Sequence, residues 1–207
     1  RPCAYRTPYG RGTATLLGFT LAPLGEGQLE QKRFLNLLAN QAHVHRHAAA
    51  DSLALHVIER ATPPGSVAPA GYLFVVNPSA WPVRSRLSYT DPCTGEMATL
   101  PRLLKGVEFS GQGALILSLE LTIPGAGLTI AYSTSQVQDW SVGEDHVSIT
   151  LYGPPETMGE TAFRLEAGAL PSVGLPAQAQ PMADERGPLL ITTYPHYRGT
   201  TILRLQK

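Results

Sequence analysis

The stretch from Leu128 to Phe163 constrains the fold more than any other part of this sequence. Apolar residues alternate with small or polar ones twice within it, and Gly153-Pro154-Pro155 interrupts the pattern before a third segment begins near Gly159. Alternation with a period of two predicts strands that bury one face. The alternating apolar residues are Leu128, Ile130, Tyr132, Val147, Ile149 and Leu151. The stretch therefore predicts three strands joined by turns, and it holds no catalytic signature.

Composition excludes several classes of partner. The chain has 207 residues, 43% of them hydrophobic and 15% charged, with a formal net charge of zero. This balance is typical of a globular protein and gives no electrostatic attraction to nucleic acid or to an anionic membrane surface. The apolar runs have strand lengths and fall short of the roughly 20 residues that span a bilayer. We therefore expect neither a nucleic acid partner nor a membrane segment, and no cofactor.

The first 50 residues differ from the rest. Thr13–Phe19 follows a Gly-x-Gly turn and is typical of a buried strand, and Gln28 to about Gln41 has the apolar spacing of a helix. A strand followed by a helix is half of a βαβ unit. Residues 1–50 are therefore predicted to be the tail of an α/β accessory domain. The chain begins Arg1-Pro2-Cys3 without an initiating Met or a signal peptide pattern, from which we expect a piece of a longer polypeptide.

Residues 51–207 contain about ten short strands separated by turn signals, a spacing typical of all-β domains. Gly71–Asn77 is a nearly continuous apolar strand, and Val83–Tyr89 follows it as the second strand of a hairpin. The predicted fold class is mainly β: an antiparallel β-sandwich or barrel-like domain after a short α/β segment of one strand and one helix. Two cysteines, Cys3 and Cys93, are few for a disulfide framework, so unlinked thiols are favoured, as is a cytoplasmic location.

His43, His45 and His47 share one face if the segment is extended, which makes a metal site conceivable. No Cys, Asp or Glu lies within the cluster, and adjacent histidines on one strand cannot complete a tetrahedral shell alone. A solvated or partly buried junction is therefore favoured over a metal-dependent hydrolase.

Glycoside hydrolysis needs two carboxyl groups facing each other across a cleft, and sequence spacing alone cannot pair them. Glu156 and Glu160 flank a Pro/Gly turn, for which a solvated position is expected. Glu108 and Glu120 lie in apolar strands, where an outward-facing position is favoured and a buried acid is the alternative.

Aromatic rings are the usual platforms for sugars, because a ring face packs on the apolar face of a pyranose. Trp81 and Trp140 both lie near turns. Buried core positions are favoured for the two rings, and a sugar platform is the alternative.

Three motifs carry a family resemblance: Ala131–Val137 (AYSTSQV), Ile149–Glu156 (ITLYGPPE) and Gly159–Phe163 (GETAF). Together with Tyr72–Asn77 they resemble the β domain that follows the catalytic barrel in β-galactosidases of glycoside hydrolase family 35. The resemblance covers roughly residues 70–167. Residues 1–50 are similar to the end of the α/β accessory domain of bacterial β-galactosidases.

The family acts on terminal β-galactosyl residues with two glutamates at strand ends of a (β/α)8 barrel. The resemblance does not extend to that barrel, so it implies no catalytic residue here. It implies a non-catalytic accessory region whose partner is the upstream barrel of the same polypeptide. Galactosides would be ligands of the complete enzyme. Two alternatives stay open: a carbohydrate-binding module that uses Trp81 and Trp140, and a metal-dependent hydrolase that uses the histidine cluster.

Overall fold

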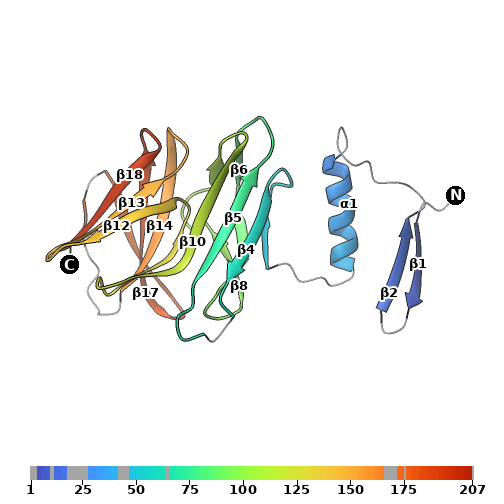
Figure 1. The fold of residues 1–207 in the computed structure, drawn as a ribbon, viewed down its shortest axis with the longest axis horizontal. Helices are drawn as coiled ribbons and strands as arrows, with labels where there is room; N and C mark the ends of the chain where they lie inside the picture. The colour runs from blue at the N-terminus through green and yellow to red at the C-terminus, as the bar shows by residue number, and fades with distance from the viewer. Residues whose placement is uncertain are drawn as a thin grey trace. The chain divides into compact units, whose positions relative to one another are not determined.

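Most of this chain forms antiparallel strands, as the alternation of apolar residues in the sequence predicts. The computed structural model describes residues 4–9, 12–17, 28–41, 47–63, 66–165, 172–174 and 176–206. It divides into two compact units, Arg1–Arg46 and His47–Lys207, where the sequence suggests a boundary after residue 50 (Figure 1). The predicted fold class, mainly β with antiparallel sheets and one helix, is confirmed.

The first unit contains a hairpin and a helix. Strands β1 (Ala4–Tyr9) and β2 (Gly12–Leu17) pair antiparallel with each other. The sequence predicts only the second of these strands, because Ala4–Tyr9 lacks a clear apolar alternation. Helix α1 (Gln28–Gln41) has the predicted bounds, with Phe34 and Leu38 partly buried on one side. No helix among the described residues is long and apolar enough to cross a membrane.

The second unit is organised around a seven-stranded antiparallel sheet. Its order, β16-β17-β14-β11-β10-β5-β4, places β11 and β14, the first and last strands of the Leu128–Phe163 stretch, side by side in its middle, whereas the two strands between them in sequence belong to another sheet. Every neighbouring pair runs antiparallel. The strands are β4 (His56–Ala61), β5 (Gly71–Asn77), β10 (Gly113–Ile123), β11 (Leu128–Ser133), β14 (Thr157–Leu165), β16 (Gln178–Asp184) and β17 (Gly187–His196).

Three smaller sheets lie against this central sheet. One has four strands in the order β12-β13-β18-β15, one has three in the order β3-β7-β8, and one has two, β6 and β9. Their strands are β3 (Ala48–Ala50), β6 (Val83–Ser85), β7 (Leu87–Thr90), β8 (Met97–Leu100), β9 (Val107–Phe109), β12 (Gln136–Val142), β13 (His146–Tyr152), β15 (Ser172–Val173) and β18 (Thr200–Gln206).

The central sheet has a hydrophobic core on each face. The first core joins it to β7, β8 and β9, and the second core joins it to β13 and β18. Along β17, Leu189 and Ile191 belong to the first core and Leu190 to the second, since successive side chains point to opposite faces. The fold is therefore a β-sandwich whose middle sheet is buried on both sides over β11, β14 and β17.

The apolar side chains of strand β10 face the first core over one part of the strand and the second core over the rest. Leu117 and Leu119 belong to the first core, whereas Leu121 packs against the second core and Ile123 belongs to it. The exchange occurs at Glu120, whose φ of 50° is in the left-handed region that non-glycine residues seldom adopt. This local irregularity allows one strand to serve both cores.

Candidate functional site

One half of the central sheet has an apolar face that no other described sheet covers. We call this surface the open face and define it as Ile58 on β4, Tyr72, Phe74 and Val76 on β5, and Ile116 on β10. Their exposed fractions are 54%, 38%, 36%, 42% and 39%. In the register, Ile58 pairs with Phe74 and Phe74 pairs with Ile116, so the three form a continuous row across three strands. Figure 1 shows β4, β5 and β10 side by side.

The open face exists because the four-stranded sheet covers only part of its side of the central sheet. Its edge strand β12 lies against β10. Ser118 on β10 is buried, whereas Ile116, two residues earlier on the same strand, is exposed. On the other side of the same strands, Leu73, Val75 and Leu117 are buried in the first core.

The sequence carries a signal for this surface. Gly71–Asn77 is apolar on both faces, which is typical of a strand that is covered on both. Only one face is covered within the described residues. A contiguous exposed apolar surface of this kind is characteristic of a contact site for another domain or protein.

The two tryptophans do not occupy the core positions that the sequence favours. Trp81, between β5 and β6, is 77% exposed, and Trp140, on β12, is 39% exposed. Asn77 and Ser79 side chains donate hydrogen bonds to the Trp81 carbonyl, so its backbone is fixed while its ring faces outward. Trp140 pairs with Ile149 and therefore points to the same side of the sheet as this buried residue. It remains partly exposed, because β12 is the edge strand of the sheet. Trp81 therefore lies in an exposed connection and Trp140 on an edge strand, and neither ring is fully buried.

The expectation that Glu160 lies in a solvated turn is wrong. The side chain is fully buried in β14. Its carboxylate accepts hydrogen bonds from the backbone N–H groups of Arg102, Leu103 and Leu104 at 2.6, 2.9 and 2.8 Å, and from the Tyr132 hydroxyl at 2.6 Å. Burial, followed by the charge of Glu160, raises the pKa of the Tyr132 phenol above its ordinary range. Glu160 therefore holds the loop after β8 on the central sheet. Its neighbour Glu156 does lie in an exposed turn.

Glu120 also departs from the favoured outward position, while Glu108 is partly exposed on β9 and pairs with Arg84. The Glu120 carboxylate is buried and is bonded to the Arg186 guanidinium, which also contacts Asp91 at 3.2 Å. Burial raises the pKa of Glu120, and the hydrogen bond from Arg186 opposes this shift. The sequence alternative of a buried acid is the correct one.

Asp91, Cys93 and Glu120 bring ligand atoms within 4.8 Å of one another. Two carboxyl groups this close resemble the spacing of a retaining glycosidase. However, the Arg186 guanidinium bonds to both of them, and Glu120 is only 5% exposed, so no sugar has access between them. Burial raises the pKa of the free Cys93 thiol to about 11. The cluster has the character of a structural ion-pair network. Cys3 lies outside the described residues, so its pairing stays untested.

A second buried polar network contains a Ser–His pair. Ser135 Oγ lies 2.9 Å from His196 Nε2, and the Tyr194 hydroxyl donates to the same Ser135 Oγ at 2.9 Å. All three residues are at most 1% exposed. Gly153 and Gly159 border this site, and an added Cβ at either would lie within 2.7 Å of His196 Nε2. A nucleophile this deeply buried cannot meet a substrate, and the network instead fills the sheet interior.

Two of the sequence motifs, Ala131–Val137 and Gly159–Phe163, meet inside the central sheet. Tyr132 and Glu160 bond to each other, Ser133 Oγ lies 3.0 Å from Thr161 Oγ1, and Thr134 Oγ1 accepts the Glu160 N–H at 2.8 Å. Buried hydrogen bonds therefore hold these two segments together.

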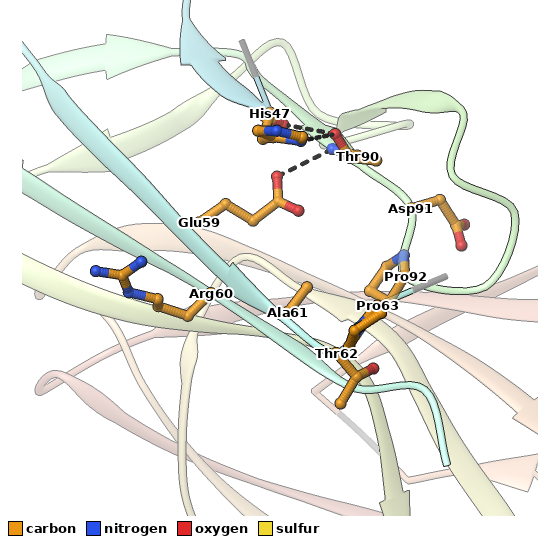
Figure 2. Close-up of a pocket in the computed structure, with 9 residues that line it drawn as sticks. All are labelled: His47, Glu59, Arg60, Ala61, Thr62, Pro63, Thr90, Asp91 and Pro92. Carbon is orange, nitrogen blue, oxygen red and sulfur yellow. Dashed lines mark hydrogen bonds between the residues drawn. The ribbon is translucent and has the colours of Figure 1, made fainter. Parts of the chain in front are cut away.

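His47 is exposed just before β3 and lines a pocket at the end of β4 (Figure 2). Its carbonyl accepts the Thr90 N–H at 2.7 Å. His43 and His45 lie outside the described residues. Among the described residues, the one grouping of metal-ligand atoms does not include His47. The junction predicted for the three histidines therefore stays a prediction, as does its alternative, a metal site.

The fold and its buried networks define the chain's main part as an antiparallel β-sandwich with one unpartnered apolar sheet face. No family model matches the chain, and a search of curated proteins found no significant match.

Proposed function

We propose that this chain is a non-catalytic accessory region of a β-galactosidase-like glycoside hydrolase. In this proposal the open face packs against the catalytic barrel of the same polypeptide and braces it. The observation that carries the proposal is the open face itself: five exposed apolar side chains, three of them paired in register across β4, β5 and β10, on strands whose opposite side contributes Leu73, Val75 and Leu117 to the first core. Four of the five side chains have no hydrogen-bonding group, the Tyr72 hydroxyl being the exception, and such a surface suits a dry contact with protein better than a contact with sugar hydroxyls.

The buried carboxylates agree with an accessory role. Glu160 bonds to three backbone N–H groups and a tyrosine, and Glu120 and Asp91 share one arginine. Each carboxylate already has its partners inside the fold and is not presented to a substrate. The kind of hydrolase is proposed from the family resemblance. The residues of the motifs that carry it form buried hydrogen bonds within the sandwich.

The test compares the 207-residue chain with the longer polypeptide that the proposal requires, in which a catalytic barrel precedes this chain. Replacing Phe74 and Ile116 by threonine removes apolar contact from the open face and keeps residues that favour strands. We expect the free energy of unfolding of the longer protein to fall by about 1–3 kcal/mol. That of the 207-residue chain should fall by clearly less, because the exposed 36% of Phe74 and 39% of Ile116 is in contact with solvent in that chain whether it is folded or unfolded. Urea denaturation of both proteins measures the difference.

Ile202→Thr is the matched control, since Ile202 is 56% exposed on β18, outside the open face. It is expected to leave both proteins unchanged. An upstream sequence without a barrel bearing two strand-end glutamates would contradict the proposal, as would equal effects of the open-face and control variants in the longer protein.

A carbohydrate-binding module is the second candidate, favoured by the exposed rings of Trp81 and Trp140. If either ring is a sugar platform, galactose or lactose will change the intrinsic tryptophan fluorescence in a saturable way. The change will then be lost in Trp81→Ala or in Trp140→Ala, whichever ring is used. The accessory role alone predicts no saturable change at millimolar sugar. Mannitol at equal concentration controls for viscosity.

A further inference from the structure

The pocket shown in Figure 2 lies between the end of β4, the turn after β7 and the start of β3. Its volume is about 330 Å³, at the lower end of the range for small-molecule sites. Ala61, Pro63 and Pro92 give it apolar walls, and Glu59 places a carboxylate between them and His47. It is separate from the open face, because Glu59 and Ile58 are adjacent in β4 and point to opposite faces.

The Glu59 carboxylate is incompletely paired. Its Oε2 accepts one hydrogen bond, from the Thr90 N–H at 3.0 Å. Among the described residues no cation forms an ion pair with it, and Figure 2 shows Arg60 extending away from it. Asp91, the other carboxylate of the pocket, is already bonded to Arg186 and to the N–H groups of Cys93 and Thr94.

A half-buried carboxylate whose one hydrogen bond comes from a backbone N–H, and whose nearby positive group is the His47 imidazole, is best complemented by a cation that replaces the lost hydration. An aliphatic stem behind that cation would pack against the proline and alanine walls, as lysine stems do on apolar surfaces. No Trp, Tyr or Phe lines the pocket, so it lacks the ring platform of a sugar site.

We propose that this pocket binds an alkylammonium group, with Glu59 as the anionic partner and Ala61, Pro63 and Pro92 as the wall for the alkyl stem. The group belongs either to a free aliphatic amine or to a lysine side chain of another polypeptide. This site does not depend on the accessory function proposed above.

The protonation of Glu59 provides a second test of ammonium binding. Partial burial raises the pKa of Glu59, while the Thr90 N–H and the charge of His47 lower it in part. The other charged groups at the pocket are Arg60 and Asp91. A bound ammonium group favours the ionised carboxylate, so it lowers the pKa of Glu59, and binding weakens as the pH falls through the pKa of the free pocket.

The experiment follows the side-chain carboxyl signal of Glu59 by NMR in the whole chain during titration with n-butylammonium. We expect a saturable shift, a lower Glu59 pKa in the bound state, and at least tenfold weaker binding to Glu59→Gln. Glu144→Gln, at an exposed turn far along the chain, is the matched control and should bind as the wild type does.

A second probe distinguishes the two sources of the ammonium group. Acetyl-Gly-Lys-Gly-amide will bind with similar affinity if the pocket accepts a lysine side chain, whereas binding of butylammonium alone assigns the site to free amines. The proposal fails if neither probe shifts the signal, if Glu59→Gln binds butylammonium as well as wild type, or if n-butanol or galactose produces the same shift as butylammonium. The wild-type measurement needs no variant, so misfolding of Glu59→Gln cannot obscure the outcome.

Discussion

Replacing Glu160 by glutamine is expected to lower the free energy of unfolding by about 3 kcal/mol. The carboxylate accepts four hydrogen bonds, three from consecutive backbone N–H groups and one from the Tyr132 hydroxyl, and it is fully buried. An amide has only one oxygen to accept these bonds, and its NH2 group would face donors. Urea denaturation at neutral pH measures the loss, and hydrogen exchange at Arg102, Leu103 and Leu104 should accelerate.

Glu156→Gln is the matched control, because Glu156 lies four residues away in an exposed turn. Its effect should stay within about 0.5 kcal/mol, as for most exposed positions. If the Glu160 variant lost less than about 1 kcal/mol, the carboxylate would not be what fixes the 101–104 loop to the sheet.

Acidification is expected to destabilise the second unit through His196. Burial lowers the pKa of this imidazole from 6.5 to about 4. The unfolded chain therefore binds a proton at a higher pH than the folded chain does. The stabilisation is complete above about pH 6.5 and is lost progressively as the pH falls toward 4, by about 2–3 kcal/mol in total.

His196→Gln should flatten this part of the stability profile, since glutamine keeps a polar group near Ser135 but does not titrate. His146→Gln, at an exposed position, should leave the profile unchanged. Urea denaturation between pH 4 and 7 gives the profile, and an NMR titration of the His196 ring in the wild type gives its pKa directly. A ring that titrates at its ordinary value would refute this account.

Several features of the fold were predictable because they depend on local patterns. Alternation marks the strands around Leu128–Tyr132 and Val147–Leu151, and the spacing of apolar residues gives α1 its bounds. Strand β1 was missed, since Arg6, Thr7 and Pro8 interrupt any apolar pattern. The candidate surface was visible only indirectly, in the apolar residues on both faces of Gly71–Asn77.

The positions of individual polar and aromatic residues were not predictable in this way. Glu160 resembles a turn residue in the sequence, because Pro154, Pro155 and Gly159 precede it. Its partners are backbone N–H groups some sixty residues away, which carry no side-chain signal. Trp81 and Trp140 are of a residue type common in cores, but Trp81 lies in the exposed connection between β5 and β6 and Trp140 lies on the edge strand β12.

The sequence by itself determined the class of structure: antiparallel strands, one helix, and which residues share a face of each strand. It did so because side-chain direction alternates along any extended chain. The tertiary structure alone decided which of those faces are covered. Coverage depends on where the four-stranded sheet stops beside β10, and that boundary leaves Ile58, Phe74 and Ile116 exposed. On the central sheet, the 101–104 loop and Arg186 lie over Glu160 and Glu120, which are buried.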